Sequence, residues 1–159
     1  MKEILQYRKS YKAGLLQAKA FRILKYRTND ALKPFKVNAT DWGVLGLLVE
    51  AKEGVQLRAI AEEVGVKQPY ITKSISNLTT LGYLETKLNK NDTRARDAFI
   101  TVAGRDFVKM AEKVVVAQLK VTFAGVSVRS LYGYVKTLDT VVTNFSNLAK
   151  EVDLDHLFE

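Results

Sequence analysis

The sequence predicts a mainly helical fold with one small β hairpin. Apolar residues recur every three or four positions over long stretches at both ends of the chain, which is typical of amphipathic helices. Near the middle, polar and apolar residues alternate at 83–88, and after a turn-rich segment the apolar residues 98–100 return as a second strand, which is typical of a short hairpin. With 159 residues, 47% of them hydrophobic, the chain is long enough to bury a core without metal or disulfide staples.

The composition excludes several classes of chemistry. The chain has no cysteine and one histidine, His156. Disulfides and cysteine nucleophiles are therefore impossible, and neither a Ser-His-Asp triad nor a metal or cofactor site is expected. We predict a protein that is not an enzyme. No apolar run approaches the ~18 residues of a membrane span and no signal-peptide core is present, which predicts a cytoplasmic location without membrane contact.

Positive charge is concentrated at the start of the chain. The sequence has 25 Lys and Arg against 17 Asp and Glu, a formal net charge of +8. Residues 1–36 alone hold ten of the basic residues and two of the acids. This balance favours a polyanionic partner such as nucleic acid.

The first half of the chain predicts two helices. The apolar spacing predicts one helix over 5–33, ending before Pro34. A second helix begins at Asn38, a good N-cap, and Asp41 three residues later resembles the second member of a capping box. Gly43 and Gly46 inside this helix indicate either a closely approaching helix or space left for something else, and we expect the close approach.

A helix-turn-helix is predicted next. Residues 58–64 form one short helix and 67–81 form the second, with Gly65 in the turn between them. Pro69 is tolerated because it lies in the first turn of the second helix. That helix buries Ile71, Ile75 and Leu78 and exposes a polar face of Gln68, Tyr70, Thr72, Lys73, Ser76 and Asn77.

A wing and further helices complete the pattern. The wing is a hairpin over 84–100, to which residues 55–57 contribute a possible third strand. Thr101 is expected to cap the next helix, which has apolar residues on two sides and so lies between two packing partners. A last helix from Ser127 repeats apolar residues at strict three- and four-residue intervals.

These outer helices exceed what a small winged domain needs. We therefore interpret them as a dimerisation bundle, stabilised by burial at about 25 cal/mol per Å². The sequence predicts a winged helix-turn-helix domain over 37–105, flanked by dimerisation helices in 1–36 and 106–159.

Four segments, in this order and spacing, carry a family resemblance. They are residues 32–42 (LKPFKVNATDW), 60–66 (IAEEVGV), 68–82 (QPYITKSISNLTTLG) and 92–104 (DTRARDAFITVAG). The last of them is similar to a wing signature of the form Asp-x-Arg followed by apolar-Thr-x-x-Gly. In these residues the chain resembles the MarR family of bacterial winged-helix regulators.

The resemblance implies a homodimeric transcriptional regulator, usually a repressor, that binds a pseudo-palindromic double-stranded DNA operator and is often released by a small aromatic or lipophilic effector. Recognition helices would enter successive major grooves about 34–36 Å apart, with the wings in the flanking minor grooves. It also implies that Asp92 braces the wing through an Arg while Arg94 enters the groove, although Arg94 and Arg96 are nearly equal candidates. Asn77 and Thr86 depart from the family, which often has basic residues there.

The candidate contacts have suitable chemistry. Gln68 can pair with adenine, Lys73 can donate to guanine, and Thr72 can contact a thymine methyl or a phosphate. An Arg guanidinium fits a narrow A·T-rich minor groove better than an ammonium does. The predicted DNA contacts are Gln68, Tyr70, Thr72, Lys73, Asn77, Arg94 and Arg96; the residues expected to hold the wing are Asp92, Thr101 and Gly104; a candidate effector pocket comprises Phe21, Tyr26 and Trp42, although plain core is the more frequent role of such aromatics.

Two other functions remain open. A winged domain that has lost DNA binding can serve as a protein-interaction module, and a small cytosolic enzyme is a weaker third hypothesis because acid–base and metal-binding residues are missing. Arg94, Arg96 and Lys73 favour DNA. The salt dependence of binding separates DNA binding from protein binding. In a plot of log K against log salt concentration, each neutralised phosphate contributes about −0.9 to the slope, and a protein partner should give a shallower slope.

Overall fold

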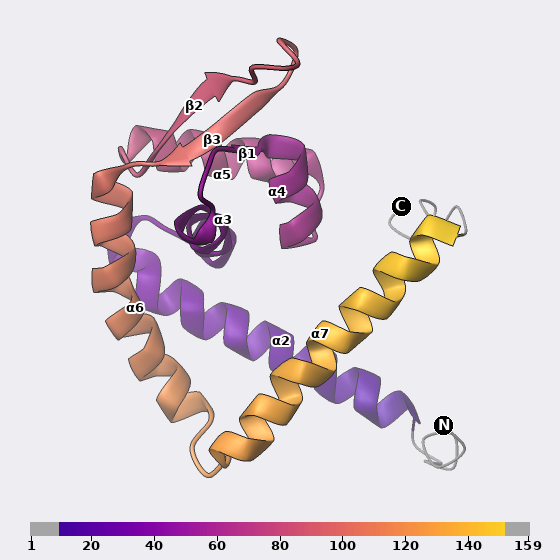
Figure 1. Ribbon diagram of the computed structural model, residues 1–159. Coiled ribbons are helices and arrows are strands. Elements are labelled where there is room, and N and C mark those ends of the chain that lie inside the picture. Colours follow the sequence, from indigo (N-terminus) through magenta and orange to yellow (C-terminus); the bar gives the residue numbers. More distant parts are fainter. Residues whose placement is uncertain (1–9, 152–159) are drawn as a thin grey trace. The chain divides into compact units, whose positions relative to one another are not determined.

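The computed structural model describes residues 10–151 (Figure 1). The chain divides into two compact units, and the boundary between them in the sequence falls between Thr122 and Phe123. His156 and the first residues of the helix predicted over 5–33 lie outside the described residues. The first unit contains α2 (Ser10–Leu32), the 3-10 helix η1 (Lys33–Phe35), α3 (Ala39–Glu50), β1 (Val55–Gln56), α4 (Leu57–Val64), α5 (Gln68–Thr80), β2 (Leu84–Leu88), β3 (Arg96–Ile100) and α6 (Val102–Thr122). The second unit contains α7 (Val128–Glu151).

The three strands form one antiparallel sheet in the order β1-β3-β2. Val55 pairs with Ala98 in β3, so the predicted third strand is confirmed, although Leu57 belongs to α4. In the hairpin, Leu84 pairs with Ile100 and Leu88 with Arg96. Leu84 and Ala98 are buried on the side of the sheet that faces the helices, while the hairpin beyond them projects from the body (Figure 1).

The core lies between the helix-turn-helix, α3 and the sheet. Its largest fully buried side chains come from five different elements, and they include Leu32, Leu45, Leu48, Ile60, Ile71, Leu78 and Leu84. Phe107, Ala111 and Val115 extend the core along α6, which packs against α2. The predicted fold class, a mainly helical winged helix-turn-helix with a small sheet, is confirmed.

The predicted start of α3 is also confirmed. Asn38 Oδ1 accepts hydrogen bonds from Thr40 N at 2.8 Å and Asp41 N at 3.1 Å, and Asp41 Oδ2 accepts from Asn38 N at 3.0 Å. These reciprocal bonds are a complete capping box. Local sequence alone determines this feature.

The expected close helix approach at Gly43 and Gly46 is not found among residues 10–151. A Cβ atom built on either residue would meet no neighbouring atom within 4 Å. Both glycines therefore border open space, the alternative that the sequence left open. A close approach does occur at Gly104, where a Cβ would lie 2.1 Å from the carbonyl oxygen of Tyr83.

Large apolar side chains remain exposed on the outer helices of the single chain. On α6, Phe107, Ala111 and Val115 are buried, whereas other apolar residues of the helix stay exposed. The exposed side chains are Tyr11, Leu15, Leu16, Phe21 and Ile23 on α2, Met110, Val114 and Val121 on α6, and Val128, Tyr132, Val135, Val141 and Val142 on α7. Within residues 10–151, no helix combines the length and the apolar character that crossing a membrane requires.

Candidate nucleic-acid interface

Helix α5 presents the predicted polar side chains at its exposed N-terminal half. Gln68, Tyr70, Thr72 and Lys73 are all exposed, and Tyr70 reaches 66% exposure. Pro69 lies in the first turn, where its missing N–H costs no helical hydrogen bond. Ile71, Ile75 and Leu78 anchor the opposite side of the helix in the core, as predicted.

Asn77 differs from the other predicted contacts on α5. It is half-buried, and its amide nitrogen donates to the carbonyl oxygen of Lys36 at 3.1 Å and to Asp41 Oδ2 at 3.0 Å. Both acceptors belong to the protein body. The Asn77 amide nitrogen is thus engaged with the protein body, and the DNA contact of this residue stays a prediction.

The partner of Asn77 is a buried carboxylate that the sequence analysis had identified only as a capping residue. Asp41 is fully buried. Besides Asn38 N and Asn77, it accepts a hydrogen bond from Ser74 Oγ, a buried hydroxyl of α5. Three donors therefore satisfy the buried carboxyl group of Asp41, and those from Ser74 and Asn77 tie α5 to the start of α3. Ser74, a hydroxyl on an otherwise apolar helix face, is the signal that could have revealed this contact.

The wing carries both predicted arginines. Arg94 lies in the exposed turn and Arg96 is the first residue of β3. Among the described residues, the ion pairs involve neither of them. Their guanidinium groups are thus available to an external anion.

Asp92 stabilises the wing turn in a different manner from the one that the family resemblance implied. Its Oδ1 accepts from the backbone N–H of Arg94 at 2.9 Å, and its carbonyl oxygen accepts from Ala95 N at 2.9 Å. Asp92 therefore shapes the backbone that carries Arg94, and the ion pairs among the described residues do not include it.

Asn89 is a wing residue that sequence reasoning missed. Its amide nitrogen donates to both carboxylate oxygens of Asp97, at 2.9 and 3.0 Å, across the base of the turn. Its Oδ1 accepts from the backbone N–H groups of Asn91 and Asp92. One side chain therefore closes the turn by mimicking a backbone. The segment is rich in Asn and Asp, but composition does not show which of them does this.

Thr101 and Gly104 join the wing to the rest of the domain. Thr101 Oγ1 accepts from Gly104 N at 3.0 Å, which confirms the predicted cap of α6, and it donates to the carbonyl oxygen of Gly82 at 2.7 Å. The close approach of Gly104 to Tyr83 leaves no room for a side chain. Both residues thus fix the base of the wing beside the end of α5.

The three aromatic residues of the predicted effector pocket are not gathered in one described cleft. Tyr26 lines a cleft of about 410 Å³ with Asn29, Asp30 and Lys33. Phe21 is 59% exposed on α2, and Trp42 packs against the hydrophobic core. Phe21 and Trp42 line none of the clefts described here.

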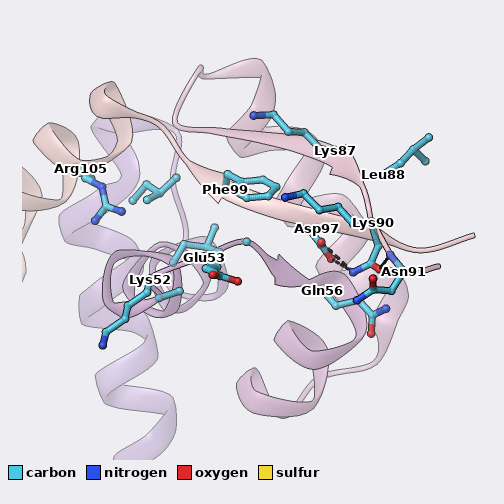
Figure 2. A pocket seen from close by; sticks show the side chains of 15 residues that line it. Lys52, Glu53, Gln56, Lys87, Leu88, Lys90, Asn91, Asp97, Phe99 and Arg105 are labelled. Carbon is cyan, nitrogen blue, oxygen red and sulfur yellow. Dashed lines mark hydrogen bonds between the residues drawn. The ribbon is translucent and has the colours of Figure 1, made fainter. Parts of the chain in front are cut away.

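A larger groove of about 780 Å³ crosses the outer face of the sheet. Figure 2 shows Phe99 and Asp97 of β3 in this groove, with Lys87 of β2 and Arg105 of α6. Lys87 is paired with Glu85 at 2.6 Å, and its ammonium lies 5.0 Å from the Phe99 ring centre. This face points away from the side of the sheet on which Leu84 and Ala98 are buried.

Solved structures share this architecture. A MarR-family transcriptional regulator from Rhodococcus sp. RHA1 matches with a TM-score of 0.79 and 24% identity, over 86% of this chain and 96% of its own. CouR from Rhodococcus jostii RHA1, bound to p-coumaroyl-CoA, matches with a TM-score of 0.75 and 24% identity, over 82% and 91%. A MarR transcriptional regulator from Methanosarcina mazei Go1 matches with a TM-score of 0.76 and 14% identity, over 87% and 99%.

A helix-turn-helix followed by a basic hairpin, on a body flanked by long helices, defines the winged helix-turn-helix class. Within that class, residues 35–95 match the model of the MarR family. The resemblance seen in the sequence is thereby confirmed: residues 35–95 match the MarR-family model, and the fold is similar to that of solved MarR-family regulators.

Proposed function

We propose that this protein is a homodimeric, sequence-specific DNA-binding transcriptional regulator. The recognition helix, predicted over 67–81 and observed as α5, enters the major groove, and the wing over 84–100 enters the minor groove. The observation that carries the proposal is the exposed polar face of α5 together with two guanidinium groups on the wing that form no ion pair in the described part of the chain. The MarR-family match over 35–95 supports it.

On α5, we assign base reading to Gln68 and Lys73, whose donors and acceptors suit adenine and guanine. Thr72 and Tyr70 contribute a methyl group, a ring and hydroxyls on the same exposed half of the helix. On the wing, Arg94 is the residue assigned to the minor groove because it lies in the turn itself. Arg96 is the alternative, at the start of β3.

The proposed dimer is supported by the exposed apolar residues of α2, α6 and α7. A water-exposed apolar seam of this extent is unfavourable for a monomer, and its burial contributes roughly 25 cal/mol per Å². The division into a DNA-binding part at 37–105 and dimerisation parts at 1–36 and 106–159 belongs to this proposal. Sedimentation should give about twice the chain mass of 17.8 kDa.

Repression relieved by an effector is the regulatory part of the proposal. It is supported by CouR, a relative by fold whose structure holds p-coumaroyl-CoA. The proposed effector is a small aromatic or lipophilic ligand. Tyr26, which lines a cleft, is the first candidate for a contact with this ligand, and Phe21 and Trp42 are the other candidates. Such a ligand must bind the DNA-incompetent dimer more tightly than the competent one, because equal affinity shifts no equilibrium.

The proposal is tested by selecting bound duplexes from random DNA with the purified protein and measuring their affinity at two salt concentrations. We expect a pseudo-palindromic consensus and an affinity that falls steeply as salt rises. Adding phenolic compounds or p-coumaroyl-CoA to the selected complex then tests for release.

A monomer in solution, or no duplex binding at low ionic strength, would contradict the proposal. Binding that prefers a protein partner and depends weakly on salt would support the interaction module in its place.

A further inference from the structure

The turn between α2 and α3 carries a lysine with an unusual backbone conformation beside the recognition helix. Lys36 has φ 58° and ψ 29°, in the left-handed region, and it is the only non-glycine residue with positive φ in the described part of the chain. Glycine adopts this conformation without penalty, so a lysine here is an outlier that calls for a role. The Lys36 side chain is exposed, and no ion pair of the described residues includes it.

The position of Lys36 is fixed by α5 itself. Its carbonyl oxygen accepts the hydrogen bond from Asn77, whose amide also reaches the buried Asp41. Asp41 in turn holds Ser74, three residues earlier on α5. The turn, the start of α3 and the recognition helix are thus joined by one set of hydrogen bonds.

Lys36 also borders the face of α5 that the proposed function assigns to DNA. Tyr70, Lys73 and Asn77 follow one another at intervals of three and four residues, so they lie along one side of the helix. Tyr70 and Lys73 line a cleft of about 420 Å³ that ends at Asn38 and Thr40, two and four residues after Lys36. A duplex whose major groove receives α5 therefore brings a phosphate strand past this turn.

The start of α3 offers little else to a phosphate. The N–H groups of Ala39, Thr40 and Asp41 already donate to the side chains of Asn29 and Asn38. Next to them, Lys36 offers an ammonium group that no ion pair of the described residues includes.

We propose that Lys36 neutralises a DNA backbone phosphate beside the major groove and that Asn77 is the positioning residue that sets its place. The inference rests on the proposed function and extends its contact surface beyond α5 and the wing. It also implies that replacing Asn77, an uncharged residue, changes the salt dependence of DNA binding.

The test is the salt dependence of binding to a selected duplex. Lys36→Gln removes the charge and keeps most of the side-chain length, and Lys113→Gln on α6 is the matched control. We expect the slope of log K against log salt concentration to become shallower by about 0.9 for each lost contact, hence about 1.8 for a dimer. Lys36→Arg should keep the wild-type slope, as should Lys113→Gln.

The positioning role is tested with Asn77→Ala, which removes no charge. If Asn77 places Lys36, this variant also has a shallower slope, and adding Lys36→Gln to it changes the slope little further. A residue that merely stabilises the fold would alter the unfolding midpoint and leave the slope of the folded protein unchanged. Circular dichroism at the assay temperature identifies a variant that fails to fold, in which case the Lys36 variants carry the test alone.

The outcomes separate this inference from the proposed function. Wild-type protein that binds no duplex contradicts the proposed function. Wild-type binding with an unchanged slope in Lys36→Gln overturns only the phosphate contact, and an unchanged slope in Asn77→Ala overturns the positioning role.

Discussion

The recognition helix and the wing tip are predicted to contact the same duplex, yet the protein holds them in place by different means. Helix α5 buries four side chains and is tied to α3 by hydrogen bonds from Ser74 and Asn77 to Asp41. In contrast, residues 90–94 of the wing are all exposed. Hydrogen bonds within the hairpin itself, mostly from Asn89 and Asp92, hold this tip.

This difference in burial means that α5 and the wing should contribute differently to the stability of the fold and to DNA binding. Buried anchors contribute most of the free energy of unfolding, whereas an exposed turn opens locally at low cost. Substitutions in the anchors of α5 should therefore unfold the protein, while substitutions in the wing should change affinity and leave stability almost unaltered.

The largest effect is expected at Ile71, which is fully buried. Ile71→Ala removes core atoms and leaves a cavity, so the free energy of unfolding should fall by about 2–5 kcal/mol. Thr72→Ala, at the adjacent exposed position, should change it by no more than about 0.5 kcal/mol. Urea titration followed by the fluorescence of Trp42, the single tryptophan, measures both. Equal losses in the two variants would contradict the described packing of α5.

At the wing, Arg94→Ala should weaken operator binding by about 1–3 kcal/mol and leave the urea midpoint unchanged. The reason is that no ion pair of the described residues includes this guanidinium, so its removal should leave the fold intact while it removes the proposed DNA contact. A gel-shift titration measures the affinity, with Arg129→Ala on α7 as the control for loss of a basic residue.

The same titration on Arg96→Ala decides between the two arginines. A larger loss of affinity in Arg96→Ala than in Arg94→Ala would assign the minor-groove contact to Arg96, at the start of β3. Wild-type affinity in both variants would remove the wing from the mechanism.

Features that depend on a few neighbouring residues could be predicted from the sequence. The Asn38 capping box, the turn before α5 and the cap at Thr101 each depend on residues a few positions apart. Each follows from local hydrogen-bonding needs and apolar periodicity. The family resemblance predicted how these elements combine into a winged helix-turn-helix domain.

Features that depend on tertiary packing could not be predicted. Asp41 forms hydrogen bonds with Ser74 and Asn77, which lie 33 and 36 residues further along the chain. The residues near Asp41 in the sequence therefore do not reveal these contacts. The hydrogen bond from Asn77 to this buried carboxyl group is visible only in the structure. Gly43 and Gly46 are similar: a missing side chain indicates space, but not what occupies it.

At the junction of the two regions, Thr101→Ala should lower the free energy of unfolding by about 1 kcal/mol. The variant loses the cap of α6 and the hydrogen bond to Gly82. Thr101→Ser keeps the hydroxyl and should retain most of the stability in the same urea titration. A loss in both variants alike would mean that the Thr methyl group, and not the hydrogen bonds, holds the junction.

The smallest effect is expected at Asn89. Asn89→Ala frees the wing turn, so the tip must be ordered when DNA binds, and affinity should fall by about 0.5–1 kcal/mol. No charge is lost, so the salt slope should stay at its wild-type value, in contrast to Arg94→Ala. Asn91→Ala is the control, because the hydrogen bond to Asn89 uses only the backbone of Asn91. If Asn89→Ala bound as tightly as wild type, the hydrogen bonds of the tip would contribute nothing to recognition, and the arginines alone would account for the wing.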